Sequence, residues 1–226
     1  MRCVLALSAI AVLSCQIRAD LPTDPKILRQ TLCSEGTVDC LRAIDSHFLA
    51  HAPPGVAREG DKLIIQPRSG RPIEMEDSGP DAEGASVGIY GYNGFVTDLQ
   101  SHLVEVQFYE GGKYLLVSRD DGKVTDLDDA PILSPDRLRF VTSSGGGHTL
   151  DRVQVWRVAP QGIELEFSYS ACGWSPGDAK WLTNREIEIT KALVDPSNAD
   201  ENPSVSEQRA HLRLEEDGWW VYDKTR

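Results

Sequence analysis

Two histidines of this chain stand at a spacing that suits a shared metal ion. His47 and His51 lie four residues apart in a segment with helical periodicity, which would place both imidazoles on one helix face. A zinc protease also needs the glutamate of a His-Glu-x-x-His motif, and this glutamate is missing. Asp45 adds too little to complete a ligand set. The pattern therefore favours two solvated surface histidines, and we expect no metal site and no cofactor.

Acidic and nucleophilic residues also fall short of a catalytic pattern. Five aspartates lie between residues 120 and 129, but they lack the Asp-x-Asp-x-Asp-Gly order and the closing glutamate of a calcium loop. The chain has no Gly-x-Ser-x-Gly motif, and no histidine lies near Cys172 in the sequence. We therefore expect a hairpin turn at the aspartates and no catalytic residues.

The cysteines outside the N-terminal apolar run are Cys33, Cys40 and Cys172, an odd number. Cys33 and Cys40 are seven positions apart, close enough for a local disulfide that pins a loop before a helix beginning near Val38. Cys172 stands among apolar residues and is expected to be a buried, inert thiol.

The first twenty residues are typical of an export signal. Met1 and Arg2 precede the apolar run Cys3–Leu13, which is about half as long as a bilayer-spanning helix needs to be. We therefore expect a periplasmic or secreted protein without a transmembrane segment.

Two cleavage sites are possible at the end of this signal. Ala19 before Asp20 fits ordinary signal peptidase and would give a signal over residues 1–19. The segment from Val12 to Cys15 resembles a bacterial lipobox, with Val12 where leucine is usual; it would end the signal at residue 14 and acylate Cys15. Such an acyl chain would anchor the protein to a membrane surface.

The charge balance is strongly acidic. The full chain carries a formal net charge of −12, and removal of Arg2 and Arg18 with the signal leaves 21 basic against 35 acidic residues, or −14. This sign argues against nucleic acid and anionic lipid as partners. It is compatible with a basic protein partner and equally with simple solubility.

Periodicity divides the remaining chain at residue 58. Residues 20–58 form a helical N-terminal segment, in which Asp24–His51 predicts two short helices, the second ended by Pro53 and Pro54. Residues 59–226 alternate with a period of two, which predicts antiparallel hairpins. The expected strands are Leu63–Gln66, Val104–Tyr109, Tyr114–Ser118, Leu138–Thr142, Val153–Val158, Ile163–Tyr169, Ile187–Thr190, Leu212–Leu214 and Trp219–Tyr222.

Glycine, proline and acidic residues mark the connections. Asp121-Gly122 and Gln161-Gly162 are signals for tight hairpin turns. Exposed loops are expected at Asp77–Gly84, Ser143–His148 and Asp195–Gln208.

Aromatic residues gather around Gly88, Gly91 and Gly94. Such tyrosines are common at interaction surfaces, and equally common in packing between sheets. The candidates for a binding surface are Tyr90, Tyr92 and Tyr109.

A repeated turn suggests a known architecture. Ser134-Pro135-Asp136 and Ser175-Pro176-Gly177-Asp178 stand 41 residues apart, about the length of a four-stranded propeller blade. Over about Val104 to Thr190 the chain resembles the TolB-type periplasmic β-propeller repeats and, more distantly, WD-type repeats. The resemblance implies a small or incomplete propeller in which Leu138 and Phe140 pack between adjacent sheets. It also implies a platform for binding proteins, since such folds fix no activity.

Together these features predict a mainly β protein that is exported to the bacterial cell envelope. The expected role is non-enzymatic binding, in which the acidic chain sequesters a basic protein partner. The alternative is a secreted hydrolase with a site assembled across hairpins.

Overall fold

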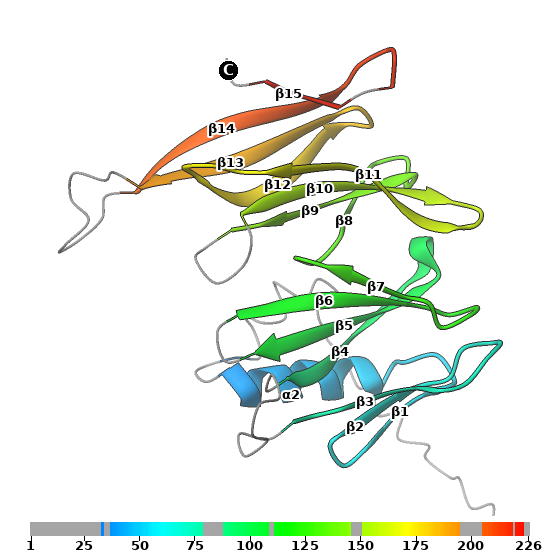
Figure 1. Ribbon diagram of the computed structural model, residues 1–226. Coiled ribbons are helices and arrows are strands. Elements are labelled where there is room, and N and C mark those ends of the chain that lie inside the picture. The colour runs from blue at the N-terminus through cyan, green and yellow to red at the C-terminus, as the bar shows by residue number, and fades with distance from the viewer. Residues whose placement is uncertain are drawn as a thin grey trace, which may run out of the picture.

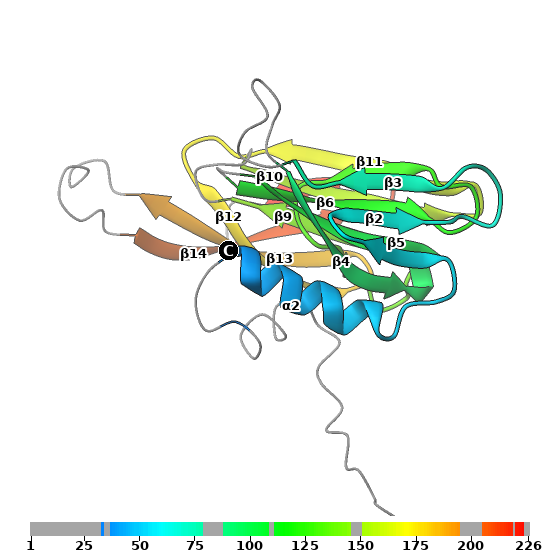
Figure 2. The same ribbon diagram turned by 90° about the horizontal axis from the view of Figure 1, so that it is seen from below.

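The computed structural model describes residues 33, 37–78, 88–108, 111–145, 151–194, 205–218 and 220–223. Helix α2 (Thr37–Leu49) precedes fifteen strands in four antiparallel sheets. Figure 1 shows the sheets stacked face to face, and Figure 2 shows α2 lying beside this stack. The prediction of a mainly β protein with a short helical N-terminal segment is confirmed.

Each sheet is a meander whose strands are ordered as in the sequence. Sheet A contains β1 (Val56–Glu59), β2 (Lys62–Ile65) and β3 (Ile73–Glu76). Sheet B contains β4 (Ile89–Val96), β5 (Ser101–Phe108), β6 (Gly111–Ser118) and β7 (Val124–Leu127), with a 3-10 turn η1 (Thr97–Leu99) after β4. Sheet C contains β8 (Ile132–Leu133), β9 (Arg139–Ser144), β10 (Arg152–Ala159) and β11 (Gly162–Ser170). Sheet D contains β12 (Ser175–Thr183), β13 (Glu186–Val194), β14 (Val205–Leu214) and β15 (Trp220–Asp223).

A separate hydrophobic core fills each space between neighbouring sheets, because the strands alternate large apolar side chains with polar ones. The core between sheets A and B contains Leu63, Ile65, Met75, Tyr92, Val104, Val106, Leu115 and Val117. The core between sheets B and C is the smallest: Leu99, Leu103, Leu116, Leu127, Phe140 and Trp156. The core between sheets C and D contains Val141, Val153, Val155, Trp174, Ala179, Trp181, Ile187, Ile189, Leu212 and Trp220.

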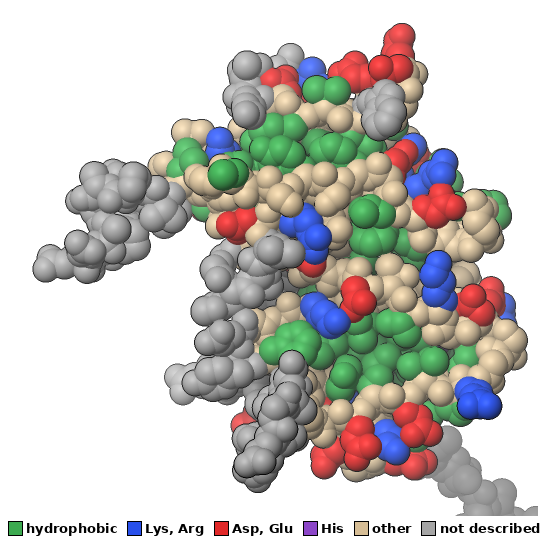
Figure 3. All heavy atoms as spheres, viewed as in Figure 1, with side chains coloured by type: hydrophobic (Ala, Val, Ile, Leu, Met, Phe, Trp, Pro, Cys, Tyr) green, Lys and Arg blue, Asp and Glu red, His purple; other side chains and the backbone are tan. Residues whose placement is uncertain are grey.

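The two end sheets turn polar faces outward. On sheet A, Lys62 pairs with Glu74 at 3.0 Å, and both side chains are substantially exposed. On sheet D, Glu186 pairs with Arg213 at 3.0 Å, and this pairing holds the pKa of Glu186 below its usual range. Figure 3 shows acidic and basic side chains at both ends of the stack. Sheets A and D lie at opposite ends in Figure 1, so the described sheets form an open stack.

Several strands have no counterpart among the expected segments. β1, β3, β4, β7, β8 and β12 were not among the expected strands, because they are short, glycine-rich or interrupted by proline. Two expected loops are shorter than predicted: Ser143 and Ser144 are buried in β9, and β14 begins at Val205. Asp77 is also not in an exposed loop, because its side chain is largely buried among arginines.

The two Ser-Pro segments are not equivalent in the structure. Ser134 and Pro135 open the turn between β8 and β9, whereas Pro176 lies inside β12. Leu138 remains in that turn and is 57% exposed, while Phe140 is fully buried. The expectation that both side chains pack between sheets therefore holds for Phe140 alone.

The N-terminal predictions are covered only in part. The signal over residues 1–19, the lipidation candidate Cys15 and the first expected helix lie outside the described residues. The boundary expected at residue 58 falls inside β1. Within the part of the chain that is described, no helix is long and apolar enough to span a membrane.

Candidate functional site

A groove of about 1010 Å³ lies between sheets B and C, and we call it the inter-sheet groove. It runs along the first strands of three successive sheets, β4, β8 and β12. Most of its wall is apolar and comes from Phe48, Ala52, Pro53, Tyr92, Phe95, Val96, Leu103, Tyr114, Ala130, Pro131, Ile132, Leu133 and Ala179. Polar side chains at its margin are His51, Asn93, Asp98, Arg137 and Asp178.

Two glycines of β4 set one wall of this groove. A Cβ atom at Gly91 would lie 2.4 Å from Cδ1 of Leu41, and one at Gly94 would lie 2.8 Å from Cδ1 of Phe48. Helix α2 can therefore approach β4 only because these positions lack side chains. This contact brings Phe48, near the end of α2, to the groove.

A charged clamp fixes the outer edge of β4. Asp45 of α2 accepts the backbone N–H of Tyr92 at 2.7 Å and the Nε of Arg58 at 2.7 Å. Arg58 also donates to the Tyr90 carbonyl at 2.6 Å, and Asp77 accepts the Tyr90 N–H at 2.8 Å while pairing with Arg42. Because these buried backbone groups already have partners, this part of the edge is closed to another strand.

An acidic hollow of about 490 Å³ adjoins the groove and shares Tyr114 and Asp178 with it. Five carboxylates line this acidic hollow, and no lysine or arginine lines it among the described residues: Glu105, Asp128, Asp129, Asp178 and Glu207. Asp128 is nevertheless paired with Arg152 at 2.6 Å. The site as a whole thus combines an apolar groove with an acidic hollow at one end.

Asn93 and Glu105 connect the two parts. Asn93 lines the groove and Glu105 lines the acidic hollow, and Nδ2 of Asn93 donates to Oε2 of Glu105 at 3.1 Å. Both side chains are more than nine-tenths buried. Oδ1 of Asn93 accepts no hydrogen bond from the described residues, although an unpartnered buried acceptor is costly. An extra residue in β4 between Tyr92 and Phe95 places Asn93 in this position.

Below the groove wall lies a buried polar pair. The hydroxyl of Tyr92 lies 3.1 Å from Nδ1 of His102, and both residues are almost fully buried. Burial, with a smaller contribution from Arg119, lowers the pKa of His102 to about 4. Burial also raises the pKa of Tyr92. His102 is therefore neutral near pH 7.

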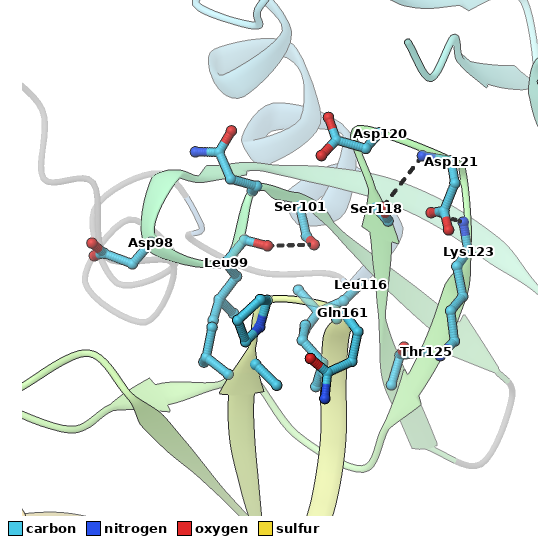
Figure 4. A pocket seen from close by; sticks show the side chains of 16 residues that line it. Asp98, Leu99, Ser101, Leu116, Ser118, Asp120, Asp121, Lys123, Thr125 and Gln161 are labelled. Carbon is cyan, nitrogen blue, oxygen red and sulfur yellow. Dashed lines mark hydrogen bonds between the residues drawn. The ribbon is translucent and has the colours of Figure 1, made fainter. Parts of the chain in front are cut away.

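A third hollow, of about 440 Å³, lies between sheet B and the tip of the β10–β11 hairpin (Figure 4). Its floor is apolar, and its rim carries carboxylates that already have partners. Asp120 pairs with Arg68 at 2.8 Å, and Asp121 accepts the backbone N–H of Lys123 at 3.0 Å. Hydrogen bonds from Ser118 and this N–H lower the pKa of Asp121. These aspartates stabilise a turn, as the sequence pattern indicates.

The tyrosine candidates have different surroundings. Tyr92 is fully buried in the core between sheets A and B, where its ring packs between the two sheets. Tyr90 is half-buried beside the same core, and Tyr109 lies outside the described residues. Asn93 and Glu105 were missed, although a glutamate within the apolar run Leu103–Phe108 is a signal that could have indicated them.

The cysteine predictions have clearer outcomes. Cys33 and Cys40 form the expected disulfide. Cys172 is exposed rather than buried, because it lies in the connection between β11 and β12 and not in a strand. The rings of His47 and His51 are 5.4 Å apart. No group of three or more histidine, cysteine or acidic residues among the described positions could hold a metal ion.

Comparison of the chain with family models, with curated proteins and with solved structures found no match.

Proposed function

We propose that this chain is an exported, non-enzymatic binding protein of a bacterial-type cell envelope, and that it holds a basic protein partner in the inter-sheet groove. The observation that supports this most strongly is the groove itself. It joins an apolar wall to a hollow with five carboxylates and no lining lysine or arginine among the described residues. The net charge of −12 has the sign that attracts a basic partner.

The arrangement of sheets suits a binding scaffold. The four meanders follow one another as the blades of a propeller do, and the first strands of sheets B, C and D all border the groove. We infer an open, propeller-like stack whose groove takes the place of the channel in a closed ring. Rigid strands thus hold the groove wall in place.

Affinity capture from the envelope fraction tests this proposal. We expect wild-type protein to retain basic proteins at low salt and to lose them at about 0.5 M salt, because screening weakens surface electrostatics. The double variant Asp178→Asn/Glu207→Gln, which alters two exposed positions of the acidic hollow, should retain much less. Glu216→Gln is the control, since it changes an exposed acid in the turn before β15. Equal capture by all three proteins would contradict the proposal.

The form of the exported protein is a separate question. Metabolic labelling with a palmitate analogue should mark the wild-type chain, and not Cys15→Ser, if the lipobox is used. We propose export in either form, so an unlabelled wild-type chain with Asp20 at its N-terminus would identify the soluble form. Retention of an intact signal in the cytoplasm would contradict export itself.

A further inference from the structure

We infer that the occupant of the inter-sheet groove is an extended peptide segment that places a lysine or arginine side chain in the acidic hollow and an aromatic or aliphatic side chain against the apolar wall. This inference rests on the proposed function and names the ligand class.

The acidic end is built to receive hydrogen-bond donors. Five carboxylates line it, of which Asp128 already pairs with Arg152, and in the adjoining groove Oδ1 of Asn93 is a buried acceptor with no partner among the described residues. The amide orientation of Asn93 is fixed, because its Nδ2 donates to Glu105. A cationic side chain supplies several donors at once, and a carboxylate oxygen can accept one of them in addition to the partner that it already has.

The apolar wall of the groove favours a peptide over a small cation as the ligand. The groove adjoins the acidic hollow through Tyr114 and Asp178, so one ligand can contact both parts. A metal ion or a free polyamine would leave the aromatic and aliphatic wall unused. An extended segment presents side chains at regular intervals and can fill both.

The residues that line the groove and the acidic hollow differ in burial, and this decides which of them can be substituted without disturbing the fold. Glu105 is buried, so Glu105→Gln alters charge within a packed site. Asp178 and Glu207 are exposed, so their amide variants test the charge without disturbing a core. Ala130 lines the groove and is half-buried, so Ala130→Trp would fill the space that an apolar side chain needs.

Fluorescence anisotropy with four labelled peptides of about twelve residues tests the inference on the full chain. One peptide combines lysine and phenylalanine, the second replaces phenylalanine by serine, the third replaces lysine by glutamine, and the fourth replaces lysine by glutamate. We expect the first to bind about tenfold tighter than the second or third, and the fourth not to bind, because both parts of the groove contribute.

The variants locate the binding. Asp178→Asn/Glu207→Gln should weaken the lysine–phenylalanine peptide severalfold while leaving the glutamine peptide unchanged, and Ala130→Trp should weaken both. Glu216→Gln and Ala57→Trp, at exposed positions outside the groove, serve as matched controls for charge and bulk. Circular dichroism melts verify that each variant is folded.

The possible outcomes separate this inference from the proposed function. Equal affinity for the first and second peptides would overturn the role of the apolar wall while leaving an acidic binding protein. Binding that the groove variants do not affect would overturn the site. If no peptide binds while basic proteins are captured, the inference of an extended peptide is wrong and the ligand is a folded protein surface. If basic proteins are not captured either, the proposed function is wrong.

Discussion

At the scale of single residues, His102 makes stability depend on pH. Its folded-state pKa of about 4 lies below the ordinary value of 6.5, so the unfolded chain binds more protons between these values. The contribution of His102 is therefore complete above about pH 6.5 and is lost as the pH falls to about 4, up to about 3 kcal/mol. The free energy of unfolding, measured by denaturant titration between pH 6.5 and pH 4, should lose this contribution in the wild type and not in His102→Asn. Parallel curves for the two proteins would contradict this.

Phe140 and Leu138 provide a second residue-scale contrast. Phe140 is fully buried and stacks on Trp156 at 5.9 Å between ring centroids, whereas Leu138 is mostly exposed. Phe140→Ala should lower the free energy of unfolding by about 3–5 kcal/mol, and Leu138→Ala by less than about 0.5 kcal/mol. Urea titrations of both variants measure this difference. A similar loss at both positions would mean that Phe140 does not anchor the space between sheets B and C.

These residues show where alternation predicts burial and where it stops. The period of two places Leu138 and Phe140 on one face, but β9 begins only at Arg139, after a turn in which Arg137 has a φ of 62°. Alternation predicts the direction of side chains inside a strand, but it does not predict the direction of those that precede the strand. Cys172 was misjudged for the same reason, because β11 ends at Ser170 and the cysteine lies in the connection after it.

At the scale of elements, the packing of α2 on β4 depends on glycine. Gly91→Ala should cost about 1–3 kcal/mol, because its Cβ would overlap Leu41, which is fully buried. The added cost should be smaller in a Leu41→Ala background, which a double-mutant cycle in urea measures. Gly88→Ala is the control, since its Cβ would have no neighbour closer than 3.6 Å. Additive losses would show that α2 is not held at Gly91.

The elements also show which local signals are sufficient. The strands of the hairpins β5–β6 and β10–β11 follow from alternation, with the glycine turn Gln161-Gly162 between the second pair, and the structure contains both hairpins. β4 and β12 were missed because glycine and proline interrupt their patterns; β4 then forms part of the core through Tyr92 and meets α2 at Gly91 and Gly94. The groove was not predictable, because it depends on how separate sheets meet rather than on any one segment.

At the scale of the whole molecule, we expect the joint between sheets B and C to be the weakest. Among the residues that the structure describes, its core has six buried members, against eight between sheets A and B and ten between C and D. Buried polar residues, including Asn93 and Glu105, occupy part of the same joint, and the groove opens into it. In a stack whose layers contact only their neighbours, stability is the sum of such joints. We therefore expect two cooperative halves, sheets A and B with α2, and sheets C and D.

Native-state hydrogen exchange tests this division. Leu63→Ala, in the core between sheets A and B, should lower amide protection in those two sheets much more than in sheets C and D. Val155→Ala, in the core between sheets C and D, should give the reverse pattern, because each cavity weakens the half that contains it. Peptide-resolved exchange in mild denaturant measures both. Equal loss in all four sheets would show that the joint transmits unfolding and that the stack is one cooperative unit.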